Sequence, residues 1–363
     1  MKSEWKTIRA ADFMEFNPRM NLKKGTIATK ISMDKLQPYT KKIPETEQAE
    51  FSGGTKFSNS DTIMARITPC LENGKTAFVD CLNKDEVAFG STEFIVLRAK
   101  PGVSDAQFVY YLATSPEFRQ VAIKSMVGSS GRQRVQQPVL ENLELVVPEL
   151  PKQKRIGGFL AAIDDKIALN AKINDNLLWQ AQALYKDRFI DLKPFNGKMP
   201  PDWQLGTVSE IIELHDSKRI PLSSRERANL TKIYPYYGAT SVMDYVDRYL
   251  FDGIYLLLGE DGTVVDDKGF PILQYVEGKF WVNNHAHIIT GKNGFTVETL
   301  YLLFSLTNVR SIVTGAVQPK ISQANLNNVS VVIPSKAELS TFNSIVQPIF
   351  SQIRNLRAES DRL

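Results

Sequence analysis

The stretch Arg134-Val-Gln-Gln-Pro-Val-Leu-Glu-Asn-Leu-Glu-Leu-Val-Val-Pro148 decides the fold, because the chain contains it twice. The second copy is Lys320-Ile-Ser-Gln-Ala-Asn-Leu-Asn-Asn-Val-Ser-Val-Val-Ile-Pro334, which aligns with the first without a gap. Each copy starts with a base, has glutamine three residues later, and ends in an alternating apolar run that is typical of a half-buried strand. A repeat at a fixed displacement, here the one that takes Arg134 to Lys320, indicates two copies of one structural unit.

A long helix follows each copy of this stretch. Pro151 suits the first turn of the first helix, and apolar or seam positions then recur at 4-3 spacing as far as Ala181 and Leu184. This heptad pattern predicts a helix that packs along another helix. The predicted seam residues are Ile156, Leu160, Ile163, Ile167, Asn170, Asn174 and Leu177 in the first helix, with Phe342, Val346, Ile349, Ile353 and Leu356 at the same displacement in the second.

These patterns predict a protein of the α+β class, built as head, helix, head and helix. We expect globular heads at residues 1–150 and 191–334 and helices at 151–190 and 335–363, with a proline- and glycine-rich linker at 191–201. Strand-like runs dominate each head, with helical stretches at Ala106–Val121 and Val297–Thr307. A first helix of nearly 40 residues would be about 60 Å long, a stiff spacer between the heads.

Composition limits the function only loosely. The 363 residues hold 44 basic and 40 acidic side chains, a net charge of +4 that favours a polyanionic partner weakly. No signal peptide or membrane-spanning run is present, and two cysteines, Cys70 and Cys81, fit a reducing cytosol. Three histidines without matching cysteines argue against a structural zinc, so we expect no metal site.

The chain resembles the specificity subunits of type I restriction-modification systems. The most specific part of the resemblance is the central run Leu150-Pro-Lys-Gln-Lys-Arg-Ile-Gly-Gly-Phe-Leu-Ala-Ala-Ile-Asp-Asp-Lys-Ile-Ala-Leu-Asn170, followed by Lys-Ile-Asn174. Three shorter runs support it: Phe89-Gly-Ser-Thr-Glu-Phe94, Leu258-Gly-Glu-Asp-Gly262 and Asn283-Asn-His-Ala-His287.

The resemblance implies a non-catalytic cytoplasmic subunit that binds double-stranded DNA and no membrane. It implies two α/β target-recognition domains, each reading half of a bipartite asymmetric sequence, and two helices forming an antiparallel coiled coil with an internal pseudo-two-fold repeat. The expected partners are two methyltransferase subunits, and restriction subunits joined through them. S-adenosylmethionine, ATP and Mg²⁺ belong to those partners.

The second helix departs from this pattern. The printed chain ends at Leu363, the counterpart of Leu177, whereas the first helix pattern continues to about Phe189. We therefore expect a shortened second spacer helix. Pro348 lies inside the second pattern and should kink or restart that helix.

Candidate DNA contacts concentrate in one loop of each head. Gly128-Ser-Ser-Gly131 precedes Arg132 and Arg134 in head one, and Gly315-Ala-Val-Gln-Pro-Lys320 stands at the matching place in head two. Glycine permits close backbone approach, and arginine can bond a guanine edge or a phosphate. Weaker candidates, each equally readable as a solubilising charge, are Lys56, Arg66, Lys75, Lys218, Arg219 and Lys292.

Other interpretations stay open at this point. Asn170 and Asn174 either fix the helix register or face solvent where the helices diverge. A metal-dependent nuclease could use Asp267, Glu277 and Lys279, and a third reading is a scaffold whose heads bind peptides.

Two further patterns point away from catalysis. The run Pro69–Thr76 resembles a phosphate loop but precedes a strand-like Ala77–Asp80, where a phosphate loop requires a helix. His285 and His287 alternate along a strand and favour a packed or hydrogen-bonded pair. We assign no catalytic residue.

Overall fold

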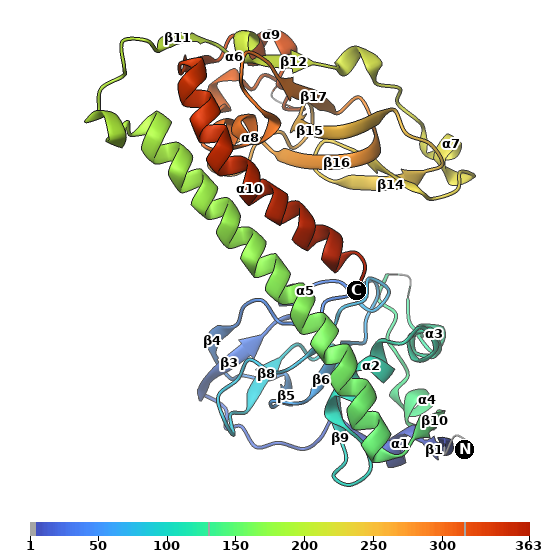
Figure 1. Ribbon diagram of the computed structural model, residues 1–363. Helices are drawn as coiled ribbons and strands as arrows, with labels where there is room; N and C mark the ends of the chain where they lie inside the picture. The colour runs from blue at the N-terminus through green and yellow to red at the C-terminus, as the bar shows by residue number, and fades with distance from the viewer. Residues whose placement is uncertain (1–4, 130, 316) are drawn as a thin grey trace. The chain divides into compact units, whose positions relative to one another are not determined.

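The computed structural model describes residues 5–129, 131–315 and 317–363, and the fold is mixed α+β as predicted (Figure 1). Two compact units divide the chain, Met1–Ala168 and Leu169–Leu363. Helix α5, Leu150–Tyr185, begins in the first unit and ends in the second, so its two parts are described with their own units.

Unit one contains two four-stranded sheets and one strand pair. The sheet orders are β2-β9-β6-β7 and β4-β3-β8-β5, and β1 pairs with β10. The strands are β1 Trp5–Arg9, β2 Met14–Phe16, β3 Ile27–Ile31, β4 Glu47–Glu50, β5 Thr55–Phe57, β6 Thr62–Ala65, β7 Thr76–Phe78, β8 Ala88–Gly90, β9 Phe94–Ala99 and β10 Glu144–Pro148. The helices before α5 are α1 Ala10–Phe13, α2 Ala106–Thr114, α3 Pro116–Lys124 and α4 Gln137–Glu141, with a 3₁₀ turn at Met33–Lys35.

Unit two contains one six-stranded sheet, ordered β12-β17-β15-β16-β13-β14, and the strand pair β11–β18. Its strands are β11 Gln204–Thr207, β12 Ile212–Leu214, β13 Tyr234–Tyr237, β14 Val242–Val246, β15 Phe251–Gly259, β16 Leu273–Val282, β17 Ala286–Gly291 and β18 Ser330–Ile333. Its helices, besides the end of α5, are α6 Val208–Ile211, α7 Ser224–Ala228, α8 Val297–Ser305, α9 Gln323–Asn327 and α10 Lys336–Ser360, with 3₁₀ turns at Lys193–Phe195, Asp216–Lys218 and Arg310–Ile312.

The displacement found in the sequence holds element by element. Helices α4 and α9 start at Gln137 and Gln323, and helices α5 and α10 start at Leu150 and Lys336, each pair separated by the same interval as Arg134 and Lys320. In each unit the strand before the long helix pairs antiparallel with the unit's first strand. The internal repeat inferred from the sequence is therefore a repeat of structure.

Each long helix docks onto its head at an equivalent place. A methyl group on Gly157 of α5 would lie 2.8 Å from the backbone nitrogen of Phe108 in α2, so this glycine permits close approach. Asn343, the counterpart of Gly157 in the second copy, accepts a 2.6 Å hydrogen bond from the Thr299 hydroxyl at the matching turn of α8. The two helices therefore meet their heads in the same register.

A buried lysine joins head one to its helix. The Lys41 ammonium, on a residue only 6% exposed, lies 5.1–5.7 Å from the ring centroids of Phe78, Tyr110 and Tyr111. Its Nζ donates to the Tyr111 hydroxyl at 3.1 Å, and that hydroxyl donates to Asp164 of α5 at 2.5 Å. Burial lowers the pKa of Lys41. The head thus supplies the cation and the helix supplies the anion.

Head two uses the opposite arrangement of charges. Glu298 of α8 is 3% exposed, and its Oε1 accepts hydrogen bonds from the Tyr275 hydroxyl at 2.7 Å and from Arg354 of α10 at 3.2 Å. Gln347, also on α10, donates to Oε2 at 2.6 Å. Here the head supplies the anion and the helix supplies the cation.

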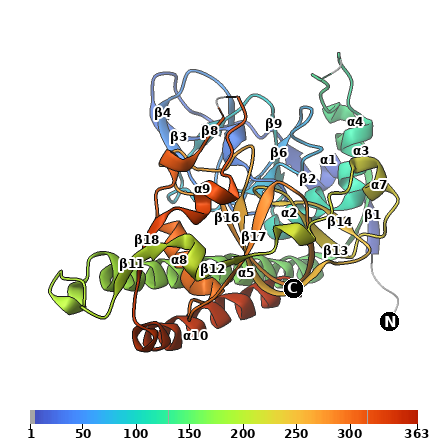
Figure 2. The same cartoon turned by 90° about the horizontal axis from the view of Figure 1, so that it is seen from above.

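Within unit two, α10 runs antiparallel to the end of α5 (Figures 1 and 2). Asn170 near the start of this segment bonds to Glu359 at 2.9 Å and to Ser360 at 3.2 Å. At the other end the rings of Tyr185 and Phe342 lie 5.8 Å apart. The order of these contacts gives the antiparallel direction that the resemblance implied.

The seam differs in detail from the heptad pattern. Leu184 is 42% exposed, whereas Tyr185 is 6% exposed and packs on Phe342 and Phe189. The prediction for Leu184 was wrong because a straight helix with 3.6 residues per turn carries the apolar stripe to the fourth residue after Ala181. Ile156, also assigned to the helix seam, packs against the core of its own head.

The remaining predicted seam residues differ in burial. Phe342, Val346, Ile353 and Leu356 are buried in unit two, and Asn170 is fully buried. The half-buried members are Leu160, Ile163, Ile167, Asn174, Leu177 and Ile349.

Two helix predictions need correction. The segment Ala106–Val121 is two helices, because Ser115 precedes Pro116, keeps an extended backbone and caps α3 through Phe118. Pro348 does not restart the second helix. Helix α10 continues from Lys336 to Ser360 with the proline on its exposed side.

Candidate nucleic-acid interface

In each head the ends of two central strands carry the candidate loop. In head one the Arg66 nitrogen donates to the Glu93 carbonyl at 2.9 Å, and the Arg66 carbonyl accepts from Val135 at 2.9 Å. In head two the Glu260 nitrogen donates to His285 and the Glu260 carbonyl accepts from Ile321, both at 2.8 Å. These paired bonds make Arg66 and Glu260 equivalent positions, and they place both loops on the same scaffold.

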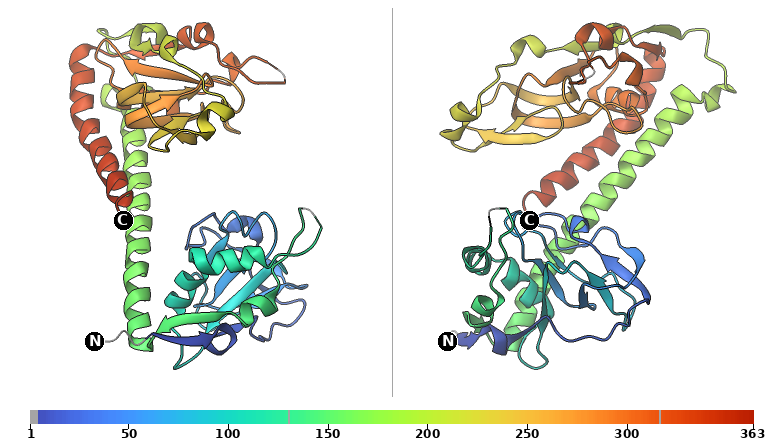
Figure 3. Two further views of the ribbon diagram at one scale, coloured as in Figure 1. Left: turned by 90° about the vertical axis from the view of Figure 1, so that its right-hand side faces the viewer. Right: turned by 180° about the vertical axis from the view of Figure 1, so that it is seen from behind.

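A pair of backbone hydrogen bonds closes each loop. Val127 and Arg134 exchange bonds of 3.0 and 2.9 Å, and Thr314 and Lys320 exchange bonds of 2.9 and 2.7 Å. The basic residues Arg134 and Lys320 therefore occupy equivalent positions in the two heads. Beyond that pair, the described residues of each loop extend from its head on the side away from that head's own helix (Figure 3).

In head one a carboxylate holds Arg134, the basic residue that closes the loop. The Arg134 guanidinium donates to both oxygens of Glu93, at 2.6–3.0 Å. This bond from Arg134 lowers the pKa of the Glu93 carboxyl. Arg66 lies beside the pair and donates to the Val135 carbonyl at 3.4 Å. Arg132, further along the loop, is exposed.

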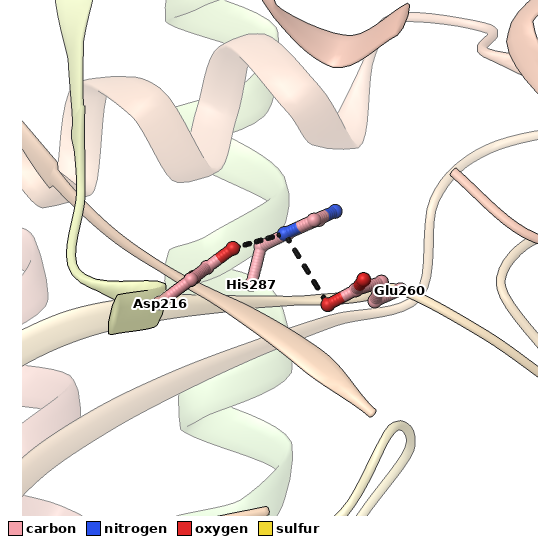
Figure 4. Close-up of side chains that lie close together, drawn as sticks. All are labelled: Asp216, Glu260 and His287. Carbon is pink, nitrogen blue, oxygen red and sulfur yellow. Dashed lines mark hydrogen bonds and ion pairs between the residues drawn. The ribbon is translucent and has the colours of Figure 1, made fainter. Parts of the chain in front are cut away.

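In head two the matching place holds a buried ionic network. Asp216 and Glu260 both point at the Nδ1 atom of His287, at 2.6 and 3.7 Å (Figure 4). Arg219 donates to Glu260 at 2.5 Å, and the Lys320 ammonium lies 3.1 Å from the same carboxylate. All three residues drawn in Figure 4 are at most 9% exposed.

Both ring nitrogens of His287 are hydrogen-bonded in this network. Its Nε2 lies 2.8 Å from the carbonyl oxygen of Ile321, which can only accept, so Nε2 carries a proton. Its Nδ1 faces the Asp216 carboxylate at 2.6 Å, which also accepts. An imidazole protonated at both nitrogens satisfies both contacts. The histidine thereby ties the loop residue Ile321 to the core of the head.

The network pulls both carboxyl groups toward the ionised form. Burial alone would raise the pKa of Asp216, but hydrogen bonds from His287, Ile288 and Gln323 hold it below its usual value. Burial also opposes ionisation of Glu260, and Arg219, His287 and Lys320 reverse that effect, so its pKa is lowered too.

The same cluster is the one place where the described residues bring three metal-ligating types together. The candidate ligand atoms of Asp216, Glu260 and His287 lie within 4.8 Å of one another. Both nitrogens of His287 are engaged, however, and Arg219 and Lys320 already neutralise the carboxylates. A divalent cation would have to displace two cations and a proton, so the geometry describes an ion-pair network.

The repeated glutamine has one task in both heads. Gln137 accepts a 2.7 Å bond from Asn17, whose side-chain oxygen accepts from the backbone of Val96 in β9. Gln323 donates at 2.5 Å to Asp216, whose other oxygen accepts from Ile288 in β17. Each glutamine thus fastens the helix after the loop to a central strand.

The weaker DNA candidates lie in several different places. Lys75 donates to the Met33 carbonyl at 2.9 Å, and Lys56 donates to the Met20 carbonyl at 3.0 Å while lying over Phe51. Arg219 is buried in the network, with a side chain 13% exposed.

Two exposed lysines of head two sit at different distances from the loop along the strands. Lys218 lies two residues after Asp216, next to the buried network. Lys292 follows the far end of β17, whereas His285 beside the loop precedes its near end. Lys292 therefore lies at the opposite end of β17 from the loop.

The nuclease candidates do not form a cluster. The backbone carbonyl of Asp267 accepts from Arg310, and Glu277 pairs with Arg354 at 3.4 Å. Lys279 lies over the Tyr249 ring. The resemblance of residues 69–76 to a phosphate loop also fails, because strand β7 follows, as the sequence predicted.

Sequence reasoning missed the anions of the site. Glu93 lies inside a quoted family run, yet nothing local links it to Arg134, 41 residues away. Asp216 and His287 are 71 residues apart, and only the alternation of His285 and His287 suggested a hydrogen-bonded pair. Both histidines are hydrogen-bonded, His285 to Asp261 and His287 to Asp216.

Comparison with known proteins agrees with this architecture. A model of the family "Type I restriction modification DNA specificity domain" matches residues 2–178 and again residues 200–361. A putative type I restriction enzyme specificity subunit of Haemophilus influenzae is 31% identical over 127 residues, which is 35% of this chain and 32% of the relative. The MjaIX specificity subunit of Methanocaldococcus jannaschii is 22% identical over 276 residues, 69% of this chain and 63% of the relative.

One solved structure shares the fold along almost the whole chain. The type I restriction-modification S subunit from M. genitalium has a TM-score of 0.58 at 15% identity, covering 99% of this chain and 93% of that one. The matched regions span from about a third to just under two thirds of the two curated relatives' own lengths. Among the residues that the structure describes, no helix is both long and apolar enough to cross a membrane. With two matches that together cover most of its length, the chain belongs to the family of type I restriction modification DNA specificity domains.

Proposed function

We propose that this chain is the DNA sequence-specificity subunit of a type I restriction-modification complex. The observation that carries the proposal is the repeated loop scaffold. In both heads the loop starts from the same strand ends, is closed by a backbone hydrogen-bond pair at a basic residue, and is followed by a glutamine that is linked by hydrogen bonds to a central strand, while the loop tips differ. Two copies of one scaffold with different tips suit a protein that reads two different half-sites of an asymmetric sequence.

In this proposal residues 1–150 and 191–334 are the two target-recognition domains, and residues 151–190 and 335–363 are the spacer helices. The subunit is not an enzyme and acts in the cytoplasm. Methyltransferase subunits, two for each specificity subunit, dock on the helices, and restriction subunits join through them. S-adenosylmethionine, ATP and Mg²⁺ act on those partners.

The contacts within each head rank the candidate DNA-binding residues. Arg132 is exposed in the head-one loop, and Lys218 is exposed two residues after Asp216 of the network. Both are assigned to direct contact, as is Lys320 with its 48% exposed side chain. Arg134 and Arg66 support the head-one loop, and Arg134 can reach a phosphate only if its hydrogen bonds to Glu93 are partly broken. The remaining candidates, Lys56, Lys75, Arg219 and Lys292, are assigned to the scaffold or the outer surface.

The test uses the complex of this chain with its methyltransferase, expressed in a host without other DNA methylation. Mapping of methylated bases should return one split, non-palindromic sequence. Residues 1–168, head one with the helix segment on which it docks, are then replaced by the matching piece of a relative with a different target. Only one half of the methylated sequence should change. A change in neither half, or in both, would contradict the modular reading.

A further inference from the structure

The loop tips of the two heads differ in chemistry while their frames agree. Gly128 has φ +139°, and a methyl group there would lie 2.9 Å from the Arg132 carbonyl oxygen. Gly315 has φ +88°, and a methyl group there would lie 2.3 Å from the carbonyl oxygen of Gln318. Both loops therefore fold back over a glycine that no other residue could replace without strain.

The basic residue that closes each loop is paired with a carboxylate of its own head. Arg134 is fixed by three hydrogen bonds to Glu93, and Lys320 is paired with Glu260. Lys320 remains 48% exposed and can still reach a phosphate, so the part of each loop left to contact a base edge is its tip.

The tip of the head-two loop, Val317 and Gln318, carries no charge. Val317 is 100% exposed and Gln318 next to it is also exposed. A single exposed valine is ordinary on a protein surface. This one stands in the loop whose counterpart in head one carries the exposed Arg132 between Gly131 and Gln133.

Base pairs differ in the same chemical respects. In the major groove thymine presents its methyl group to apolar side chains, adenine presents a donor and an acceptor that suit glutamine, and guanine presents two acceptors that suit arginine. Resting on the function proposed above, we propose that the loop of head two reads an A·T pair through Val317 and Gln318, and that the loop of head one reads a G·C pair through Arg132.

The chemistry of the loop tips also distinguishes recognition of base edges from binding to the phosphate backbone. A phosphate contact needs a cation or a hydrogen-bond donor, and the Val317 side chain offers neither, whereas the Gln318 amide could donate to a phosphate or to a base. Attachment to phosphates alone would leave the exposed Val317 side chain without a role in a head whose loop already carries the exposed cation Lys320. The Val317 side chain is therefore assigned to a base edge, and the Gln318→Ala variant tests whether the neighbouring amide reads a base or binds a phosphate.

The experiment compares methylated sequences of single-residue variants in the complex with the methyltransferase. Gln318→Ala and Val317→Ser should relax one A·T position in the half-site of head two, reducing its discrimination about 5- to 150-fold. Leu205→Ser is the matched control, because Leu205 is an apolar residue of the same head, 73% exposed, on strand β11. It should leave every position unchanged, and thermal melting should place all three variants close to the parent chain.

Arg132 is tested in two steps in head one. Arg132→Lys keeps the charge but loses the bidentate bond, so it should relax one G·C position while leaving overall binding nearly intact. Arg132→Ala should relax the same position. If both substitutions weaken methylation equally at all sequences, or Arg132→Lys has no effect, Arg132 binds phosphate and this half of the proposal is wrong.

Three results would overturn the assignment for head two. They are a half-site without an A·T pair, relaxation at a G·C position, and unchanged specificity in both tip variants. The proposed function stands in all three, because the parent chain still methylates a split sequence. If the parent complex methylates no split sequence at all, the proposed function and this assignment fail together.

Discussion

The charge pair that joins head two to its helix should contribute strongly to the stability of that head. Glu298 is 3% exposed and accepts from Tyr275, Gln347 and Arg354. Arg354→Met removes the cation from this set of partners and leaves a buried carboxylate with two neutral donors. Breaking a buried pair by removing one member costs about 3–5 kcal/mol.

The structure places this case at the lower end of that range. The Arg354 side chain is 18% exposed and also lies 3.4 Å from Glu277, so the pair is partly solvated. We expect Arg354→Met to lower the free energy of unfolding by about 3 kcal/mol. For a unit of this size that corresponds to a fall of about 6–12 °C in the melting temperature. Glu298→Gln should cost less, because its amide keeps one acceptor for Tyr275.

Urea unfolding of the full chain measures the effect. Trp203 is buried in the core of head two, so its fluorescence follows this head. The double variant Glu298→Gln/Arg354→Met should be more stable than the sum of the single changes predicts, by about 1–3 kcal/mol. Arg357→Met, an exposed arginine of the same helix, is the control. Additive effects, or a loss no larger than in the control, would refute the reasoning.

Three further predictions concern the helix and the heads. Asn170→Leu removes a buried polar group from the seam, so it should raise the melting temperature, while mapping of methylated bases should show a mixture of spacings between half-sites. A methyl group on Gly157 would lie 2.8 Å from Asp105, so Gly157→Ala should destabilise head one by about 1–3 kcal/mol, whereas Gly158→Ala, with open space, should be neutral or stabilising in the same melting assay. Asp216 has a lowered pKa in the folded chain, so its contribution is fully present above pH 3.8 and is lost as the pH falls through the folded value. Asp216→Asn should therefore destabilise head two at pH 7, and the difference from the parent chain in urea midpoint should shrink well below pH 3.8.

Patterns that are local along the chain were readable from the sequence. The constant displacement from Gln137 to Gln323 identified α9, β18 and α10 as the counterparts of α4, β10 and α5. This was possible because alternation and helical periodicity depend on neighbouring residues. The same reasoning found the inner face of α10, where Phe342 and Val346 are buried.

Contacts between distant residues were not readable. A heptad pattern assigned Leu184 to the seam because spacing alone cannot tell it from Tyr185, and the choice depends on the aromatic partner Phe342 across the helix pair. Likewise Arg219 reads as a surface cation until the fold places Glu260 beside it, 41 residues away. Cations could be counted from the sequence, but which of them are already neutralised depends on the sheet.

The opposite charges of the two head–helix contacts imply that the heads cannot be exchanged between helices. The displacement that takes Arg134 to Lys320 also makes Asp164 the counterpart of Phe350, and Ala168 the counterpart of Arg354, in the two helices. If head two were grafted onto the first helix, Glu298 would meet Ala168 in place of its cation, and Asp164 would enter the position of an apolar ring. We expect that graft, with residues 191–334 placed before Glu149, to fold poorly, with a lower melting temperature than the same graft carrying Ala168→Arg and Asp164→Phe. Equal stability of the two grafts would mean that the charges do not select the helix. A gain from the paired substitutions would mean that each helix carries a complement to its own head, and that a new specificity is best built by moving a head together with the segment of helix beneath it.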